Sequence, residues 1–243
     1  VILVNINPAY RTHELEFVLK QAGISVVVAA TSFKTSDYAA MIEEVRPNCP
    51  DLRRVVLIGT PSWEELVAPG RTGDPAELAR RQAVLSPDDP INIQYTSGTT
   101  GFPKGATLSH HNILNNGYNV GRLCGYTPED RVCIPVPFYH CFGMVMGNLA
   151  CTSHGATMVI PGPGFDPKAT LHAVAAERCT SLYGVPTMFI AELNDPDFES
   201  YDLSSLRTGI MAGSPCPVEV MKQVVERMGM AEVTICYGMT ETS

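Results

Sequence analysis

Several features are missing from this 243-residue sequence, and each absence excludes a class of protein. No apolar run approaches the roughly 18 residues of a membrane span, so we expect no transmembrane segment. Lys and Arg number 17 against 25 Asp and Glu, and this net charge of −8 provides no basic field for nucleic acid. With 17% charged and 45% hydrophobic residues and no repeats, a disordered, collagen-like or coiled-coil chain is excluded. The sequence predicts a soluble globular protein in which a local site must hold any polyphosphate.

The cysteines also lack a pattern, because no C-x-x-C pair occurs and most lie within apolar segments. We therefore expect buried thiols in a reducing compartment rather than disulfides or a zinc site. The first residue, Val1, lies inside an apolar run, and no initiator Met or signal peptide is visible. These features predict a piece of a longer protein and a cytoplasmic location, with the mitochondrion as the alternative for a eukaryotic source.

Apolar runs alternate with helical patterns along the whole chain. Residues 1–59 show a β-α-β-α-β order, which predicts a partial first α/β subdomain with a parallel sheet. Residues 60–90 are rich in Pro, Gly, Asp and Arg and predict a connecting surface segment. The alternation resumes over 91–243, which predicts a second α/β subdomain. We expect two doubly wound, mostly parallel subdomains that bind ligands at the carboxyl ends of their strands.

Residues 95–105, with the sequence YTSGTTGFPKG, carry the most specific pattern. Their glycines allow close backbone approach to a ligand, their hydroxyl groups can donate hydrogen bonds, and Lys104 supplies a positive charge. The segment is not a Walker A loop, because Pro103 replaces the second glycine and Gly105 follows the lysine. A surface hairpin loop is the alternative. The expected position between a strand and a helix starting at Ser109 favours a polyphosphate site.

This string resembles the signature phosphate loop of the adenylate-forming superfamily, which includes acyl-CoA synthetases, luciferases and peptide-synthetase adenylation domains. Three further matches follow in the family's order: residues 137–143 (PFYHCFG), 212–215 (AGSP) and 237–241 (YGMTE). Residues 5–11 (NINPAYR) and 184–189 (GVPTMF) are similar to fatty acyl-CoA synthetases in particular. The resemblance covers essentially the whole chain and implies the N-terminal domain of such an enzyme, incomplete here.

The resemblance implies a ligase that joins a medium- or long-chain fatty acid to coenzyme A with ATP and Mg²⁺. It assigns catalytic roles to Lys104, His140, Thr240 and Glu241, and Glu241 also binds the metal. The implied nucleotide-binding residues are Thr96, Ser97, Gly98, Thr99, Thr100, Gly101, Lys104, Gly213, Ser214, Pro215, Tyr237, Gly238 and Thr240. The implied substrate-binding residues are His140, Gly184, Val185, Met211, Ala212, Gly213 and Met239.

Several of these residues have a simpler interpretation when they are taken alone. Tyr237 follows an apolar strand and could be a core aromatic rather than a wall for a purine. His140 lies among aromatic residues and could be a core histidine, while an isolated Thr240–Glu241 pair would be solvated surface. The small and apolar residues of the expected acyl tunnel are equally explained by packing.

Further parts of the family pattern would come after Ser243, and they leave the function open between alternatives. The family has an aspartate that binds ribose, a hinge, and a mobile C-terminal domain whose lysine stabilises the adenylation transition state. We expect the chain alone to be inactive without them. One alternative is an adenylating enzyme that passes the acyl group to a carrier protein, and the other is a non-catalytic nucleotide-binding module. Oligomeric state does not follow from the sequence.

Overall fold

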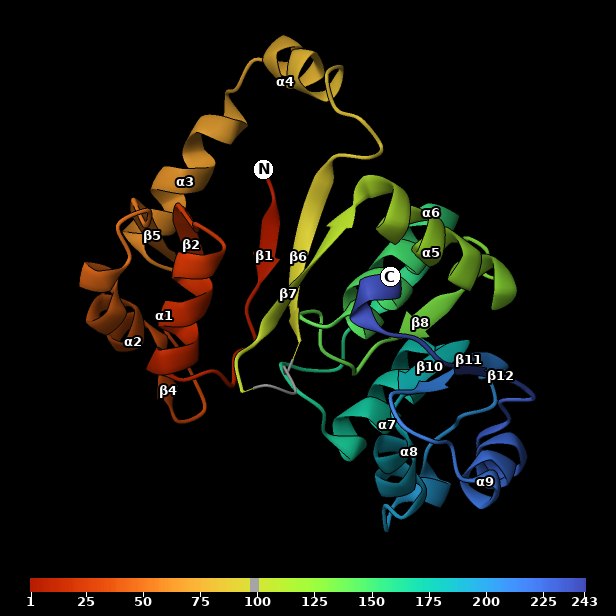
Figure 1. The fold of residues 1–243 in the computed structure, drawn as a ribbon. Coiled ribbons are helices and arrows are strands. Elements are labelled where there is room, and N and C mark those ends of the chain that lie inside the picture. Colours follow the sequence, from red (N-terminus) through yellow and green to blue (C-terminus); the bar gives the residue numbers. More distant parts are fainter. Residues whose placement is uncertain (97–100) are drawn as a thin grey trace. The chain divides into compact units, whose positions relative to one another are not determined.

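The computed structural model describes residues 1–96 and 101–243 and divides into two compact units, Val1–His110 and His111–Ser243 (Figure 1). Each unit contains its own sheets and core. The elements of the first unit are β1 (Leu3–Asn5), α1 (Thr12–Gln21), β2 (Val26–Ala29), β3 (Ser32–Phe33), β4 (Ser36–Asp37), α2 (Tyr38–Val45), β5 (Arg54–Leu57), α3 (Pro61–Arg71), α4 (Pro75–Gln82), β6 (Pro90–Thr96) and β7 (Lys104–Ser109).

Strand pairing in the first unit explains why the division does not fall at the predicted boundary within residues 60–90. β6 pairs in parallel with β1, with Leu3 opposite Asn92, so it belongs to the same sheet as the start of the chain. β7, which the sequence did not predict as a strand, pairs antiparallel with β6. The loop after β6 therefore connects two antiparallel strands, instead of leading directly from a strand into a helix as expected. The separate pair β2 and β5 is parallel, as predicted.

Helix α1 lies on the core of the first unit through one apolar face. Leu15, Val18 and Leu19 are buried, at the spacing expected of an amphipathic helix. The helix begins at Thr12, with Arg11 as the N-cap residue. The Glu14 carboxylate accepts a hydrogen bond from the Arg11 backbone amide at 3.0 Å, which satisfies one free donor at the helix start.

The second unit is built around one parallel sheet in the order β12-β11-β10-β8-β9. A π-helix, η2, lies between β8 and α6. The elements are α5 (His110–Leu123, starting at the last residue of the first unit), β8 (Arg131–Cys133), η2 (Phe142–Leu149), α6 (Ala150–His154), β9 (Thr157–Val159), α7 (Pro167–Glu177), β10 (Ser181–Gly184), α8 (Pro186–Leu193), β11 (Thr208–Ala212), α9 (Val218–Met228), β12 (Glu232–Cys236) and the 3-10 turn η4 (Thr240–Thr242).

Both faces of this sheet are covered, which confirms the doubly wound arrangement predicted for the second half of the chain. Successive strand residues point to opposite faces, and Leu182 and Tyr183 accordingly belong to two different core clusters. The Leu182 cluster includes side chains from α7, α8 and α9, while the Tyr183 cluster includes side chains from η2 and α6. The fold is thus α/β with mostly parallel strands, and the antiparallel β6–β7 pair is the main departure.

One buried residue on α8 is out of keeping with its apolar surroundings. Glu192 is fully buried, and neither of its carboxyl oxygens has a hydrogen-bond partner among the described residues. Desolvation raises the pKa of this carboxyl well above its usual value. Burial therefore favours the neutral form of this carboxyl, and neither oxygen is used in a hydrogen bond with a described residue.

A polar cluster at the amino ends of the strands contrasts with Glu192, because every charge in it is paired. The Arg207 guanidinium donates to the buried Asp130 carboxylate at 2.9 Å and to Glu232 at 3.1 Å. Burial alone would raise the pKa of Asp130, but hydrogen bonds from Thr180, the Thr127 amide and Arg207 outweigh it and lower the pKa. These contacts tie the loop before β8 to β10 and β11.

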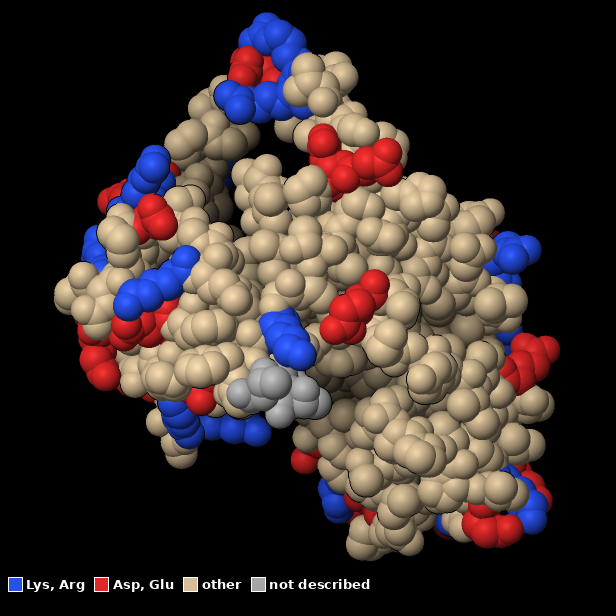
Figure 2. Space-filling model, in the orientation of Figure 1, with Lys and Arg blue, Asp and Glu red and all other residues tan. Residues whose placement is uncertain are grey.

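None of the helices in residues 1–96 and 101–243 is long and apolar enough to cross a membrane. On the face shown in Figure 2, Lys and Arg side chains are interspersed with Asp and Glu and separated by uncharged surface.

Candidate functional site

The candidate site residues fall on both units, and the phosphate-loop residues belong to the first. Thr96 and Lys104 lie opposite each other at the ends of β6 and β7, and the Thr96 hydroxyl donates to the Lys104 carbonyl at 3.5 Å. The Lys104 side chain is exposed and forms no ion pair with any described residue. Gly101 has a φ of +95°, a conformation that side chains rarely adopt. Four predicted phosphate-binding residues, Ser97, Gly98, Thr99 and Thr100, lie outside the described residues.

The hairpin interpretation of this segment is therefore correct as geometry, and it is compatible with a phosphate site. A hairpin end presents Lys104 to solvent at a position fixed by the strand pairing. An ammonium without an ion pair to any described residue and a glycine with positive φ are both compatible with an anionic ligand.

The predicted adenine-flanking residues lie together in the second unit. β11 and β12 run parallel with Ala212 opposite Cys236, so the segments Gly213–Pro215 and Tyr237–Gly238 leave the sheet at the same edge. Carboxyl ends of parallel strands are where α/β sheets bind ligands. Tyr237 is 98% exposed, so the interpretation as a core aromatic is wrong. An exposed ring beside an exposed turn fits the flat face of a purine.

The position of Gly213 leaves little room for a side chain. Its φ is +89°, and a Cβ atom there would lie 3.0 Å from the Val185 Cγ1 atom. Val185 follows β10, so three neighbouring strands contribute their ends to this edge of the sheet. The Cys216 thiol donates to the Met211 carbonyl at 3.6 Å, which holds the turn after β11.

The Thr240–Glu241 pair lies on η4, directly after this edge. The Met239 amide donates to the Thr242 hydroxyl at 3.2 Å, and the same hydroxyl donates to the Met239 carbonyl at 2.9 Å. Glu241 is exposed and makes no ion pair with a described residue. Its carboxylate is therefore available to a ligand.

Cys141 links this turn to His140. The thiol is buried, and its pKa is raised by desolvation, while hydrogen bonds with Ser243 and Thr240 oppose the shift and the Glu241 charge reinforces it. The η4 turn consequently lies against the residue next to His140. The structure thus brings His140, Thr240 and Glu241 into one neighbourhood of the second unit.

His140 has a defined protonation pattern. The Phe142 amide donates to the His140 Nδ1 atom at 3.0 Å, so Nδ1 is an acceptor and the ring proton of the neutral form lies on Nε2. The side chain reaches solvent, yet desolvation by the protein packed on its other side lowers its pKa. It is not a core histidine. A neutral ring with a free Nε2–H is a hydrogen-bond donor suited to a carboxylate or phosphate oxygen.

The segment after His140 is rigidly packed. Gly143 approaches the Pro137 carbonyl so closely that a Cβ atom would lie 2.4 Å from its oxygen. The π-helix η2 starts at Phe142, whose ring stacks on Tyr183 at 5.6 Å, and the Tyr183 hydroxyl donates to the Met146 carbonyl at 2.9 Å. π-helical segments are rare overall but frequent at functional sites.

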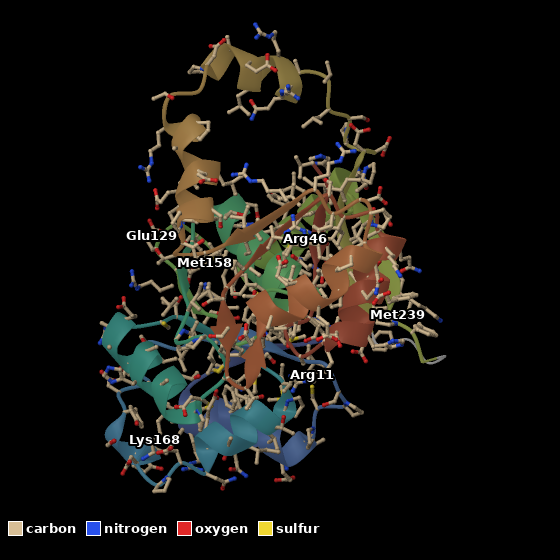
Figure 3. All side chains as sticks on the ribbon, turned by 90° about the vertical axis from the view of Figure 1, so that its left-hand side faces the viewer. Arg11, Arg46, Glu129, Met158, Lys168 and Met239 are labelled. Atoms are coloured by element: carbon tan, nitrogen blue, oxygen red, sulfur yellow. The ribbon has the colours of Figure 1, made fainter. Side chains whose placement is uncertain are left out.

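The predicted substrate-binding residues do not share one environment. Met211 is fully buried in the core cluster that includes α7, α8 and α9, where packing accounts for it. Gly184 and Ala212 are also buried, and a Cβ at Gly184 would lie 2.9 Å from the Phe189 ring. Met239, labelled in Figure 3, is 58% exposed. Their roles in acyl binding stay predictions.

Metal binding by Glu241 would need help from a ligand. No group of three or more His, Cys, Asp or Glu side chains among the described residues could hold a metal ion. Mg²⁺ at phosphate-binding sites is bound by one or two carboxylates together with the phosphates themselves. A single exposed carboxylate therefore fits a metal that arrives with a nucleotide.

The sequence did not reveal two contacts of these residues. One is the contact of Cys141 with Thr240 and Ser243, which joins residues 99 and 102 positions apart and leaves no local pattern. The other is the contact of Phe102 with α1, for which the spacing of His13 and Phe17 was a usable signal, because residues four apart share one helix face.

The fold is α/β, and the candidate adenine-flanking residues follow the carboxyl ends of the neighbouring strands β10, β11 and β12. The family model described as "AMP-binding enzyme" matches residues 1–243, and the chain belongs to this family.

Named relatives extend the comparison. The chain is 48% identical over 261 residues to a putative acyl-CoA synthetase, YngI, of Bacillus subtilis, and covers 47% of it. It is 44% identical over 263 residues to the mitochondrial medium-chain acyl-CoA ligase ACSF2 of Danio rerio, and covers 43% of it. The crystal structure of the anthranilate CoA ligase AuaEII in complex with anthranoyl-AMP matches with a TM-score of 0.83 at 25% identity, covering 99% of this chain and 45% of that one. All of this chain thus aligns to under half of either curated relative.

Proposed function

We propose that this chain is the nucleotide-binding part of an ATP-dependent fatty acid–CoA ligase. In the first step the fatty acid carboxylate attacks the α-phosphorus of ATP, which forms an acyl-adenylate and releases pyrophosphate. In the second step the thiolate of coenzyme A attacks the acyl carbon and AMP leaves, which gives the thioester. Family membership and the acyl-CoA ligase names of the relatives support this proposal.

The observation that carries the proposal is the shared edge of β11 and β12. Gly213, Ser214 and Pro215 would flank one side of the adenine, and the exposed Tyr237 ring, with Gly238 beside it, would cover its face. The register of the two strands supports their joint use, because the two segments emerge next to each other.

Charge stabilisation at the phosphates would come from the residues that the family resemblance assigns to them. Lys104 would bind the outer phosphates and the departing pyrophosphate, together with Thr96, Gly101 and the four loop residues from 97 to 100. Thr240 would donate a hydrogen bond to the α-phosphate. Mg²⁺ held by Glu241 would neutralise phosphate charge. Fixed charges of this kind act most strongly on the charge that develops in a transition state.

His140 would orient the fatty acid carboxylate. Its Nε2–H can donate one hydrogen bond, and its lowered pKa keeps the ring neutral near pH 7. A neutral donor would position the carboxylate without suppressing its nucleophilicity as strongly as an imidazolium would. Val185, Gly213 and Met239 are the accessible members of the predicted acyl-binding set.

The acyl chain is proposed to be of medium or long length, in line with the name of the vertebrate relative. A cytoplasmic location is proposed from the thiols: all eight cysteines are free and six are buried, which suits a reducing compartment.

The test uses the full-length protein that contains this chain. We expect fatty-acid-dependent exchange of pyrophosphate into ATP, and AMP release that requires coenzyme A. Exchange without coenzyme A-dependent AMP release would point to a carrier-protein acceptor instead. Absence of exchange with every fatty acid from C6 to C18, by protein that binds ATP, would leave a nucleotide-binding module and refute the ligase.

A further inference from the structure

The side chain of Phe102, next to the candidate phosphate-binding Lys104, packs against helix α1. It is 49% exposed, yet its ring contacts two aromatic side chains of α1. The ring centroids are 4.9 Å from Phe17 and 5.7 Å from His13, with tilts of 31° and 44°. We call these three residues the α1 aromatic contact. Tilted rings at this separation attract each other beyond the apolar area they bury.

Helix α1, which carries two of these aromatic residues, is anchored in the core of the first unit. Leu15, Val18 and Leu19 fix its inner face in the core of the first unit. Arg11, labelled in Figure 3 at the start of the helix, donates from its guanidinium to the Ser36 hydroxyl at 2.9 Å. His13 and Phe17 are four residues apart, so both project from the same side of this anchored helix.

The backbone between Phe102 and Lys104 transmits the position of the ring. Only Pro103 separates the two residues; it is buried, and its ring fixes its own φ. A proline also restricts the residue before it to extended conformations. Lys104 is paired with Thr96 on its other side. The backbone of Lys104 is therefore fixed by strand pairing with Thr96 and, two residues earlier in the chain, by the contact of the Phe102 ring with α1.

We propose that Phe102 is a positioning residue that sets the location of the Lys104 ammonium through the α1 aromatic contact. This inference rests on the proposed function, and it adds a role for α1 in binding the outer phosphates. Phe102 does not touch the nucleotide in this scheme. Its ring instead restricts the backbone from Phe102 to Lys104, which lowers the conformational entropy lost when the lysine binds the phosphates.

The test compares Phe102→Ala with a matched surface truncation, Tyr118→Ala, in the full-length protein. Tyr118 is 48% exposed and stacks on His154 with centroids 5.1 Å apart, so it loses an equivalent contact on α5. We expect Phe102→Ala to weaken equilibrium binding of ATP and pyrophosphate on the order of 3- to 10-fold, the range expected for one aromatic contact. AMP binding should change less than 2-fold, and Tyr118→Ala should leave all three affinities unchanged.

Two further variants separate positioning from general structure. Phe102→Tyr retains the ring and should restore ATP binding to within 2-fold of the unaltered protein. Phe17→Ala should reproduce the loss from the helix side, and the double variant Phe17→Ala/Phe102→Ala should bind ATP no more weakly than Phe102→Ala alone. Unfolding midpoints of all variants identify any loss caused by misfolding.

The outcomes distinguish this inference from the proposed function. If Lys104→Ala weakens ATP binding while Phe102→Ala behaves like Tyr118→Ala, the positioning role is wrong and the phosphate site stands. If Phe102→Ala weakens ATP and AMP equally, the ring acts on the fold rather than on the lysine, and the inference is overturned. If Lys104→Ala changes neither ligand, the phosphate site itself is wrong.

Discussion

Replacing the buried carboxyl of α8 should stabilise the protein. Glu192 carries two oxygen atoms without partners inside a core of apolar side chains. Burial of an unpartnered polar group costs about 1–3 kcal/mol in proteins. Glu192→Met keeps an unbranched side chain of similar length and removes that cost, so we expect a gain of about 1–3 kcal/mol at pH 7. For domains of roughly 150–250 residues each kcal/mol corresponds to about 2–4 °C in Tm.

The gain should depend on pH, because the pKa of Glu192 is higher in the folded than in the unfolded protein. Between the two pKa values the folded state binds more protons than the unfolded state. The free energy of unfolding is therefore highest below the pKa that Glu192 has in the unfolded protein, about 4.5, and it falls as the pH rises toward the pKa of the folded protein. Glu192→Met lacks this loss, so its advantage should widen from pH 5 to pH 8. Glu192→Gln should remove the pH dependence while keeping an unpartnered amide.

Urea unfolding at pH 5, 6.5 and 8 measures these effects, with Glu226→Met as the control. Glu226 is an exposed glutamate on α9, so its replacement should leave stability within about 0.5 kcal/mol. A loss of stability in Glu192→Met at pH 8, or an advantage that does not vary with pH, would mean that the carboxyl has a stabilising partner. Either result would refute the reasoning.

Three further predictions concern the site and the fold. Lys104→Ala should weaken ATP binding by about 1.5–3 kcal/mol and AMP binding far less, because the lost charge faces the outer phosphates; calorimetric titration with both nucleotides measures this, and equal losses would contradict it. Glu241→Gln should fold normally but slow adenylation, with partial recovery at high Mg²⁺, and an unchanged metal dependence of pyrophosphate exchange would exclude the metal role. Asp130→Asn should lower the free energy of unfolding by about 1–3 kcal/mol at pH 7, toward the lower end because Arg207 is partly exposed to solvent. The pKa of Asp130 is lowered in the folded protein, so the wild-type carboxylate loses its stabilising effect as the pH falls, and the variant should lack this loss. Thermal unfolding from pH 3 to 7 tests both effects.

Local sequence was sufficient to predict most of the second unit. The apolar run over 208–212 forms β11, and the amphipathic pattern over 218–228, with Val224 and Met228 buried four residues apart, forms α9. Asp166 caps α7 as the Asp-Pro sequence suggests, and its carboxylate accepts from the Ala169 amide at 2.8 Å. Parallel strands that are buried on both faces are recognisable in a sequence as continuous apolar runs.

Features that depend on distant partners were not predictable in this way. The segment Lys104–Ser109 has little strand character by itself and becomes β7 through pairing with β6. The pairing of β1 with β6 joins residues 89 positions apart, which moved the division of the chain. The unpartnered state of Glu192 likewise follows from the packing of α7, α8 and α9, which no local pattern encodes.

The pairing of Thr96 with Lys104 also determines to which face of the hairpin the lysine side chain points. Side chains alternate between the two faces of a strand, so sliding β7 by one residue along β6 would turn the lysine to the opposite face of the hairpin. A single-residue insertion within 97–103 must therefore either enlarge the loop or reverse the direction of the charge. Chimeras with loops of other lengths should therefore keep the direction of the Lys104 side chain only where they keep this register.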